Sequence, residues 1–198
     1  MKMTRKEIEK YVPFNEQEEK DREEMLKWID TGLDLLTRKD GFAHWTASAW
    51  VVNHEHTKVL MAYHNIYDSW SWLGGHCDGD TDFLHVAIKE VKEESGITNV
   101  LPVTEDIFSL EILTVDGHIK RGEYVPSHLH LNVTYLLEAD EKEDVRIKED
   151  ENSNVGWFGM EEAVQASSEP WFKEHIYNKL NKKLKLFLEE KNVRSDNS

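Results

Sequence analysis

The sequence predicts a fold of the α+β or α/β class with a mixed β-sheet, and three observations support this prediction. Apolar residues recur at helical spacing near both ends, runs of alternating and β-branched residues lie between them, and one further helical segment separates two groups of strands. The 198 residues suffice for one domain with a single sizeable core. We therefore expect a single domain over residues 1–198, with an N-terminal helical extension (1–40), a core (41–168) and a C-terminal helix and tail (169–198).

Both ends of the chain are predicted to be helical. Apolar residues three and four positions apart predict helices between Thr4 and Arg38, divided at Pro13: Ile8, Tyr11, Met25, Leu26, Ile29, Leu33 and Leu36. A final amphipathic helix is expected from Pro170 to about Lys191, with an apolar stripe of Ile176, Leu180, Leu184 and Phe187. Residues 192–198 are expected to be a frayed tail.

Strands are predicted where the hydrophobic period changes to two. Residues 44–53 and 57–64 are separated by a turn-like segment and are expected to form a hairpin. Two longer strands, 107–115 and 128–139, are joined by a polar loop that contains glycine. A short strand at 152–159 precedes a helix at 160–167, which completes the mixed order of elements.

A central helix of about thirteen residues is predicted to begin near Phe83 and to end before Gly96. Capping side chains precede it: Asp80, Thr81 and Asp82. At roughly 100° per residue, one stripe carries the apolar residues Leu84, Ala87, Ile88 and Val91, and the face beside it carries Glu90, Glu93 and Glu94. We expect the core residues and the carboxylates to occupy separate faces.

The three glutamates crowd like charges onto one side of this helix. Pairs three and four positions apart should destabilise an isolated helix by a few tenths of a kcal/mol, roughly, for each pair. A hard cation such as Mg²⁺ or Mn²⁺ would offset this repulsion, because it prefers oxygen ligands. A solvated charged face is the alternative on the triplet alone. Gly74 and Gly75, just before the helix, permit the close backbone approach that a carbonyl ligand or a phosphate contact requires.

Composition narrows the possible functions. The net charge of −15 repels phosphate backbones at long range, so stable nucleic-acid binding is not expected. No apolar run is long enough to span a bilayer, the N-terminus lacks a secretory signal, and the single cysteine, Cys77, allows no intramolecular disulfide. A cytoplasmic protein without membrane association is expected, and a homodimer remains open.

The segment from Gly75 to Ile97 resembles the Nudix box, G-x5-E-x7-R-E-U-x-E-E-x-G-U, where U is a bulky aliphatic residue. The matching positions are Gly75, Glu90, Val91, Glu93, Glu94, Gly96 and Ile97. Thr81 stands where the first glutamate of the box is expected, and Lys89 replaces the arginine. Lysine keeps the positive charge but loses the planar fork that can hold two carboxylate oxygens. Asp78, Asp80 and Asp82 are the candidates to compensate for the carboxylate that Thr81 lacks.

This resemblance to Nudix hydrolases, supported by further segments over most of the chain, implies an α/β/α sandwich around a mixed sheet. It implies a hydrolase that cleaves a diphosphate linkage in a nucleoside diphosphate derivative or a related small phosphorylated substrate, with Mg²⁺ or Mn²⁺. The positions matching the family's metal ligands are Glu90, Glu93, Glu94 and the Gly74 carbonyl, with Lys89 also at the catalytic site. Glu90 is one candidate base, and acidic residues outside the box, Glu111, Asp116 and Glu123, are candidates for a base or a further ligand.

Candidate substrate contacts surround the box. They are Gly75 and His76 in the preceding loop and His128 and His130, which share one face of a strand because they are two positions apart. His76, Cys77, His128 and His130 also supply a possible zinc set, which we rank below substrate contact because their spacing is not a recognised zinc pattern. Lys120 and Arg121 could hold a phosphate, and aromatic residues could stack on a base or pack in the core: Tyr67, Trp70, Trp72 and Tyr124.

Two alternative functions use the same fold. A non-catalytic module that binds a nucleotide would explain the departures at Thr81 and Lys89. A Nudix-fold isomerase acting on an isoprenoid diphosphate would need a reactive cysteine, and Cys77 is the single candidate. Cys77 has no evident adjacent base in the sequence, so a small structural thiol is the preferred interpretation.

Overall fold

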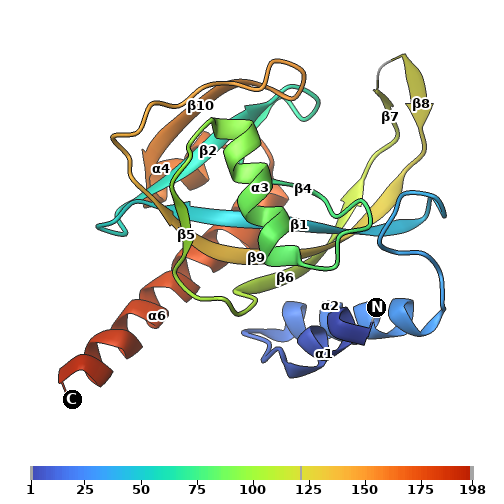
Figure 1. Cartoon of the computed structure of the whole chain (residues 1–198), viewed down its shortest axis with the longest axis horizontal. Helices are drawn as coiled ribbons and strands as arrows, with labels where there is room; N and C mark the ends of the chain where they lie inside the picture. The colour runs from blue at the N-terminus through green and yellow to red at the C-terminus, as the bar shows by residue number, and fades with distance from the viewer. Residues whose placement is uncertain (1, 121, 197–198) are drawn as a thin grey trace.

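The fold combines an eight-stranded mixed sheet with helices, as the computed structural model shows for residues 2–120 and 122–196 (Figure 1). The strands are β1 (Ala43–Val52), β2 (Lys58–His64), β3 (Ser69–Ser71), β4 (Leu73–His76), β5 (Val100–Pro102), β6 (Ser109–Val115), β7 (His118–Lys120), β8 (Glu123–Val125), β9 (His128–Ala139) and β10 (Asn152–Gly159). The helices are α1 (Lys2–Lys10), α2 (Glu16–Asp30), α3 (Phe83–Ser95), α4 (Met160–Ala166), α5 (Pro170–Phe172), a π-helical turn (Lys173–Tyr177) and α6 (Asn178–Asp196). The predicted fold class is confirmed.

The sheet is mixed because one pair of neighbouring strands is parallel. Its order is β10-β2-β1-β9-β5, with β3 on β2, β4 on β1 and β6 on β9. β1 and β9 run parallel over ten registered positions, whereas the other pairs are antiparallel. β7 and β8 form a separate two-stranded ribbon that projects beyond the main sheet (Figure 1).

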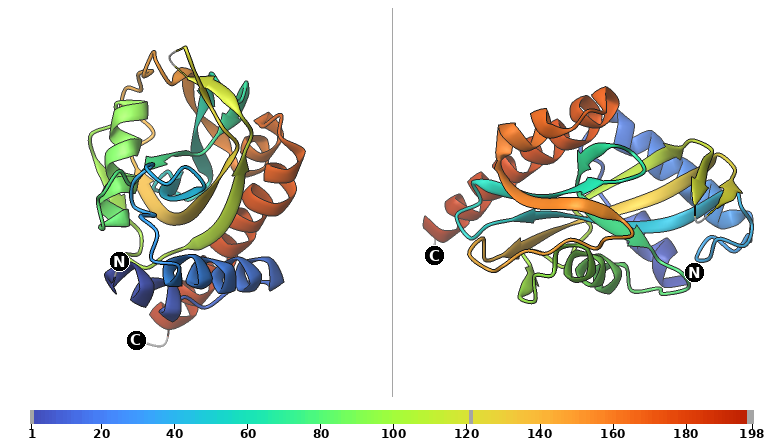
Figure 2. Two further views of the ribbon diagram at one scale, coloured as in Figure 1. Left: turned by 90° about the vertical axis from the view of Figure 1, so that its right-hand side faces the viewer. Right: turned by 90° about the horizontal axis from the view of Figure 1, so that it is seen from above.

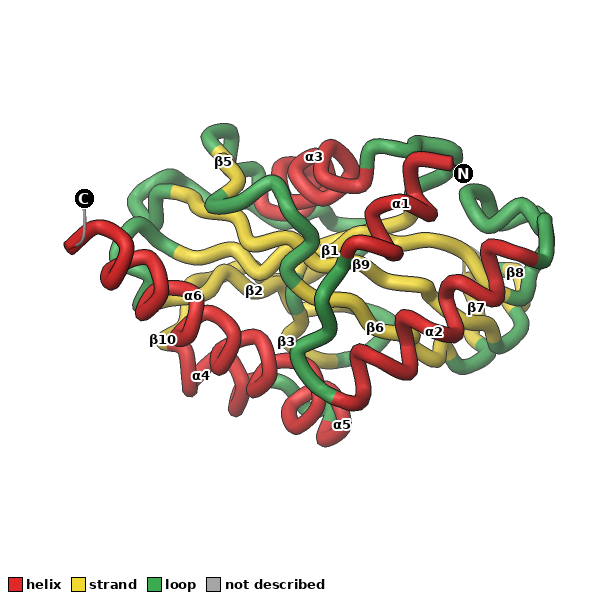
Figure 3. Tube along the Cα trace, turned by 90° about the horizontal axis from the view of Figure 1, so that it is seen from below, coloured by secondary structure: helices red, strands yellow, loops and turns green. Residues whose placement is uncertain are grey.

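Helices cover both faces of the curled sheet, which confirms the predicted sandwich. α3 lies on one face, and α4 to α6 lie on the other (Figures 2 and 3). α1 and α2 form the predicted N-terminal extension, in which α2 contacts β6. Within the described ranges, no helix is both long and apolar enough to cross a membrane.

Alternation along β1 sends its side chains into two different environments. Trp45, Ala49 and Val51 enter the core beneath α3, whereas Trp50 packs on the opposite face with Tyr177. Three polar residues, His44, Thr46 and Ser48, fall on the same face as Trp50 by this alternation. Each is buried. This face of the strand therefore changes from apolar to polar residues, and two of the polar residues, Thr46 and Ser48, line the cleft described below.

The N-terminal helices end earlier than predicted. α2 stops at Asp30 rather than near Arg38, because Thr31 Oγ1 donates a hydrogen bond to the Trp28 carbonyl (2.6 Å) and Gly32 takes a left-handed conformation (φ 74°). Residues 33 to 36 continue without a helix, yet Leu35 is buried in the core. The helical spacing of the predicted stripe was thus misleading beyond residue 30.

The C-terminal helix is longer and less regular than predicted. A π-helical turn at Lys173–Tyr177 follows α5, and α6 then continues to Asp196, so the expected frayed tail was wrong for residues 192–196. Residues 197–198 lie outside the described ranges. Ile176, Leu180 and Leu184 are buried as predicted, because this stripe packs on the sheet.

The predicted hairpin of β1 and β2 is confirmed near its turn. Val52 is registered with Val59, and the Asn53 side chain accepts hydrogen bonds from the Thr57 and Lys58 amides (2.8 and 2.9 Å). Further along, β1 pairs with β4 and β9 instead. This exchange of partners places β4, with its two glycines, directly beside the polar half of β1.

Candidate active site

The central helix α3 has the predicted bounds, and its ends are fixed by local chemistry. Asp82 is the N-cap and accepts a hydrogen bond from the His85 amide (3.0 Å). Gly96 ends the helix in the left-handed conformation (φ 75°), and its amide donates to the Lys92 carbonyl. Of the three predicted capping residues, Asp82 rather than Asp80 or Thr81 is therefore the N-cap. The box residues therefore lie on one regular helix.

The prediction of separate core and carboxylate faces was wrong. Glu90 and Glu94 are buried, whereas Leu84 and Ile88, expected in the core, are only half-buried. Of the predicted stripe, Ala87 and Val91 are buried, and Phe83 and Val86 are buried beside them. The helix packs against β4, where two successive residues have no side chain, and this leaves room for carboxylates between helix and strand.

The double glycine brings the backbone of β4 against these carboxylates. The Gly74 amide donates a hydrogen bond to Glu94 Oε2 (3.0 Å). A Cβ atom at position 75 would lie 2.5 Å from Glu90 Cδ, and one at position 74 would lie 2.6 Å from the Ala47 carbonyl oxygen. A side chain at position 74 is therefore excluded by the backbone of β1, whereas one at position 75 would have to displace the Glu90 carboxylate.

Burial disfavours the ionised form of the two buried carboxylates, Glu90 and Glu94, when no cation is bound. It raises the pKa of Glu94 well above its usual value, and nearby Glu90 adds to this, while the Gly74 amide opposes it. Burial also raises the pKa of Glu90, with Lys89 opposing. A divalent cation would reverse this balance, because it favours the ionised form of both groups. The donor set of two buried carboxylates beside a backbone strand therefore fits a hard metal.

Glu93 lies at the more open side of the same cluster. Lys89 Nζ is 3.3 Å from Glu90 Oε1 and 3.6 Å from Glu93 Oε1. Lys148 Nζ is 3.4 Å from Glu93 Oε2 and 3.0 Å from Glu151 Oε2. Two ammonium groups thus contact the carboxylates that the resemblance assigns to metal binding, and Lys89 joins two of them.

These groups line one cleft with a volume of about 540 Å³. Its floor comes from β1 and β9: Asn132 Oδ1 accepts hydrogen bonds from Thr46 Oγ1 (2.9 Å) and Ser48 Oγ (2.8 Å). Of the predicted site residues, the lining includes Gly74, Gly75, His76, Lys89, Glu90, Glu93, Glu94 and His130. The structure therefore brings together residues from the box, the preceding strand and β9.

Several other predicted residues lie elsewhere. Glu111, a candidate base or ligand, is fully buried in an ion-pair network with Lys179 Nζ at 2.9 Å and is not part of the described cleft lining, so its position gives the candidate role no support. Asp116 and Glu123 are exposed near the β7–β8 ribbon and are likewise outside that lining. The Lys120 side chain and Arg121 lie outside the described residues.

The remaining candidates, which are aromatic residues, aspartates and His128, also include some that line the cleft and some that do not. Tyr67 and Trp72 line the cleft, whereas Trp70 packs on Phe158 and Tyr124 is 68% exposed on β8, and neither belongs to the described lining. Asp78 also lines it and pairs with Arg38 (3.0 Å), while Asp80 binds His85 and Asp82 caps α3. His128 is not in the lining, but its Nε2 lies 3.2 Å from His130 Nε2.

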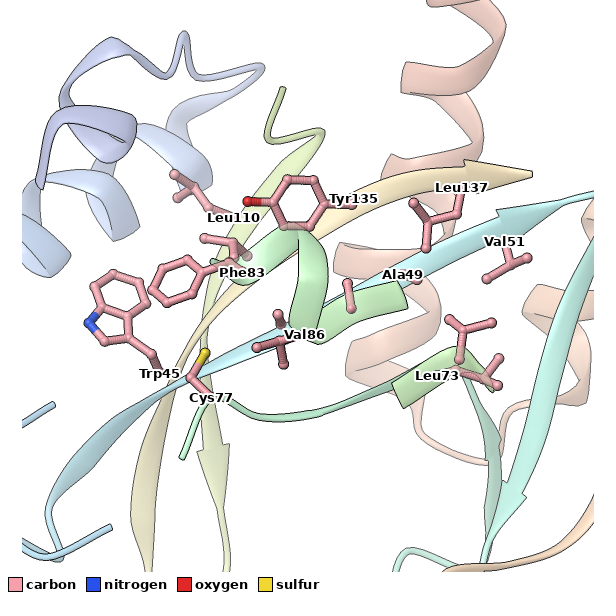
Figure 4. Close-up of a cluster of buried hydrophobic side chains, with 14 of the residues drawn as sticks. Trp45, Ala49, Val51, Leu73, Cys77, Phe83, Val86, Leu110, Tyr135 and Leu137 are labelled. Carbon is pink, nitrogen blue, oxygen red and sulfur yellow. The ribbon is translucent and has the colours of Figure 1, made fainter. Parts of the chain in front are cut away.

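Cys77 belongs to the hydrophobic core. It is buried with Trp45, Phe83 and Val86 between β1 and α3 (Figure 4). Burial raises the pKa of its thiol, so the reactive thiolate is disfavoured. We expect Cys77→Ala to retain turnover within a factor of a few, measured with any substrate that the wild-type protein cleaves. Loss of turnover at unchanged folded fraction would restore the thiol as a reacting group.

Some residues that line the cleft or lie behind its lining were missed by the sequence reasoning. Asn132 continues the two-residue spacing of His128 and His130, so strand alternation could have indicated it. His44 becomes visible only through the register between β1 and β9, which pairs it with His130. Arg38 and Lys148 come from irregular segments far away in sequence, and no sequence pattern indicates their positions.

A mixed sheet between helices, with carboxylates beside a glycine-rich strand, describes a protein with a cleft suited to a divalent cation and an anionic substrate. Comparison with known families agrees with this class: the NUDIX domain matches residues 43–180, which is more than half of the chain. The chain therefore belongs to the Nudix family, as its box predicts. The family and its hydrolase members indicate an enzyme that hydrolyses a pyrophosphate linkage.

Individual relatives are more distant. An RNA pyrophosphohydrolase of Pelagibacter ubique is 28% identical over 143 residues, covering 70% of this chain and 89% of that protein. A C. elegans Ap4A hydrolase in a binary complex has a TM-score of 0.52 at 22% identity, covering 74% and 98% of the two chains. A Nudix hydrolase from M. smegmatis has a TM-score of 0.50 at 12% identity, covering 70% and 84%. The structural likenesses support the fold, and relatives that are hydrolases give no support to a non-catalytic module.

The close approach of Gly75 to Glu90 gives a direct test of the site. Gly75→Ala should displace the Glu90 carboxylate, because its Cβ would lie 2.5 Å from Cδ, and should lower turnover by on the order of 10²-fold. The far end of a flexible side chain can move, so the fold should persist. Gly156→Ala is the control, because its Cβ would find only ordinary contacts at 3.8 Å or more. Steady-state rates of both variants, with circular dichroism, test this; equal rates would contradict it.

Proposed function

We propose that this protein is an Mg²⁺- or Mn²⁺-dependent hydrolase that cleaves a diphosphate linkage in a nucleoside diphosphate derivative or a related small phosphorylated molecule. The observation that carries the proposal is the contact between the buried carboxylates of α3 and the backbone of β4 in the lining of the cleft. Burial raises the pKa of both Glu90 and Glu94, and a bound cation would explain why two such groups lie together.

In this proposal Glu90, Glu93, Glu94 and the Gly74 carbonyl hold the metal. A metal ion bound there would offset charge on the phosphate oxygens and lower the pKa of the attacking water. Lys89 Nζ lies within 3.6 Å of carboxylate oxygens of Glu90 and Glu93, so it can hold the two side chains in one arrangement. It would do so as a single point charge in place of the arginine fork.

Glu90 is our candidate for the base that accepts a proton from the water. Its carboxylate lines the cleft, and a bound cation would favour the ionised form, which is the form that can accept a proton. Acidic residues outside the box remain an alternative, and Glu151 now replaces Glu111 among them because it lines the cleft.

The cleft also offers groups for the substrate. Arg38, Lys89 and Lys148 line it and would offset phosphate charge, although the whole chain is strongly acidic. Tyr67 and Trp72 present aromatic rings on which a base could stack, and Gly75, His76 and His130 lie close to the carboxylates. His128 would act through its contact with His130.

The names of two relatives suggest where to begin with substrates. One is called an RNA pyrophosphohydrolase and the other an Ap4A hydrolase, so nucleotide polyphosphates are the first group to test. The net charge of −15 disfavours a stable complex with long RNA, so we propose a small molecule. We further propose a cytoplasmic protein without membrane association that acts as one domain over residues 1–198; a homodimer remains to be tested by light scattering.

The experiment is a screen of nucleoside diphosphate derivatives, dinucleoside polyphosphates and nucleoside triphosphates with Mg²⁺ or Mn²⁺. We expect release of a phosphorylated product that stops on addition of EDTA and resumes when metal is restored. Release that persists in excess EDTA would contradict metal dependence. Metal binding without any product across the panel would instead favour a substrate outside the nucleotides.

A further inference from the structure

We propose that His44, His76 and His130 form a second metal site, for a borderline transition metal such as Zn²⁺, next to the carboxylate set but chemically distinct from it. Each imidazole offers a nitrogen atom, and these three nitrogens all lie within 4.8 Å of one another. Imidazole is a preferred ligand of zinc and other late transition metals, whereas the glutamates suit Mg²⁺ or Mn²⁺. The site goes beyond the proposed hydrolysis and does not depend on it.

The histidines come from three adjacent strands whose register sets their positions. His44 of β1 is paired with His130 of β9, and its neighbour two positions on, Thr46, is paired with His76 of β4. Side chains two positions apart on a strand share a face, so β1 places His44 between the other two. The nitrogens are therefore held by the paired strands of the sheet.

His44 supplies an independent observation that points to a ligand. The residue is only 4% exposed, and neither ring nitrogen has a hydrogen-bond partner within the described part of the chain. A buried polar group without a partner is unusual and destabilising, and a bound cation would satisfy one of these nitrogens. Burial, with a smaller effect of nearby His128, lowers the pKa of His44 to about 4, so the ring is neutral at physiological pH. Metals bind that neutral form.

The imidazole rings are packed so closely that only small side-chain movements would bring their nitrogens into a tetrahedral arrangement. The ring centroid of His44 lies 4.9 Å from those of His76 and His130, which are 5.0 Å from each other. At zinc–nitrogen distances of about 2.0–2.1 Å, tetrahedral ligands are roughly 3.3 Å apart, so small side-chain rotations suffice. His128 stacks on His44 at 4.9 Å and can supply the fourth ligand; otherwise that position is open to water or substrate.

The location explains why the sequence suggested a different zinc set. Cys77 follows His76 directly but lies in the core with Trp45, so the thiol cannot share the imidazole cluster. His44 replaces Cys77 in the proposed ligand set, because the register of β1 and β9 pairs His44 with His130. Because His76 is two residues from Gly74 on β4, roughly 7 Å along the strand, both proposed metal sites border the same cleft.

The test uses full-length protein treated with chelator and titrated with Co²⁺, whose visible absorption reports tetrahedral nitrogen ligands, and with Zn²⁺ by calorimetry. We expect one tight equivalent of Zn²⁺ in the wild-type protein. His76→Gln and His130→Gln should each weaken it at least tenfold and abolish the Co²⁺ spectrum. The matched control is His175→Gln, a histidine exposed on the π-helical turn, and it should bind as the wild type does.

Glu93→Gln separates the two sites, since it should leave the Co²⁺ spectrum and the tight Zn²⁺ equivalent intact. Circular dichroism and thermal melts, with and without Zn²⁺, verify that each variant folds. A Zn²⁺-dependent rise in Tm in the wild type, absent from His130→Gln, would support the site. Unchanged binding in the His76 and His130 variants, the absence of tight binding in the wild type, or loss of tetrahedral Co²⁺ only in Glu93→Gln would each overturn it.

Discussion

Glu93→Gln and Glu94→Gln are each expected to lower metal-dependent turnover by about 10²-fold or more while preserving the fold. Metal-ion catalysis contributes several kcal/mol of transition-state stabilisation, and about 1.4 kcal/mol corresponds to tenfold in rate. Removal of one carboxylate weakens the binding of the metal ion that supplies this stabilisation. Steady-state rates over a range of Mg²⁺ and Mn²⁺ concentrations measure the effect. Glu190→Gln, an exposed glutamate on α6, is the matched control.

The stability of Glu94→Gln gives a second readout. Burial raises the pKa of Glu94, so its ionisation destabilises the metal-free protein as pH rises above about 4.5. Glutamine has no charge to ionise, and its amide oxygen can still accept from Gly74. We therefore expect the metal-free variant at pH 8 to melt at or above the wild-type Tm, and to gain less on addition of metal.

Two results would contradict this account of the box. Wild-type turnover in both variants would remove the metal role of the glutamates. A variant that is both inactive and unfolded says nothing about catalysis. Glu93→Gln is therefore the decisive variant, because the Glu93 side chain is 43% exposed and its replacement should not disturb the fold. A loss of activity there at unchanged Tm would favour the proposed role.

Glu18→Gln is expected to cause the largest loss of stability, about 3–5 kcal/mol, because it breaks a buried ion-pair network. Glu18 is fully buried on α2, with Lys179 Nζ at 3.2 Å and Lys183 Nζ at 2.9 Å from Oε1. Lys179 also lies 2.9 Å from buried Glu111 on β6. The network therefore ties the N-terminal extension, the sheet and α6 together.

Charge balance explains why the loss should be large. The two carboxylates of Glu18 and Glu111 face the two ammonium groups of Lys179 and Lys183, so removal of one carboxylate leaves excess buried positive charge. Tyr11 also donates to Glu18 Oε2 at 2.6 Å and would lose a charged acceptor. The double variant Glu18→Gln with Lys183→Met restores the balance and should be less destabilised than the sum of the single variants.

Thermal and urea denaturation measure this prediction. For a chain of this size, we expect a fall in Tm on the order of 10 °C. Glu19→Gln is the matched control, because the adjacent glutamate is exposed and should change stability by less than about 0.5 kcal/mol. Equal stability of the Glu18 and Glu19 variants would show that the network contributes little.

The same network predicts loss of stability in acid. Burial by itself would raise the pKa of Glu18, but Lys183 and Lys179 offset this and hold the pKa below its usual value of 4.5. The folded state therefore binds this proton more weakly than the unfolded state. Its contribution is present above about pH 4.5 and is lost as pH falls through the lowered pKa. Denaturation midpoints between pH 6 and 3 should fall less in Glu18→Gln than in the wild type.

Local patterns predicted the elements that carry the candidate site. The caps at Asp82 and Gly96 fixed α3, and alternation fixed β1 and β9 as strands, because these signals depend on neighbouring residues alone. The same local reasoning failed where packing decides. It continued α2 past Asp30. On α3 it included Leu84 and Ile88 with Ala87 and Val91 in the buried stripe and omitted Phe83 and Val86, because the neighbouring elements decide which apolar side chains of a helix become buried.

The sequence by itself determined the family, the mixed fold and the placement of the three glutamates on α3. It could do so because the box has a fixed spacing along one turn and one helix. The tertiary structure alone decided which distant residues join them. Strand register brought His44 beside His130, and burial put Glu111 into the ion-pair network instead of the cleft. Such contacts depend on how strands and helices far apart in sequence pack together, and the spacing of residues along the chain does not specify that.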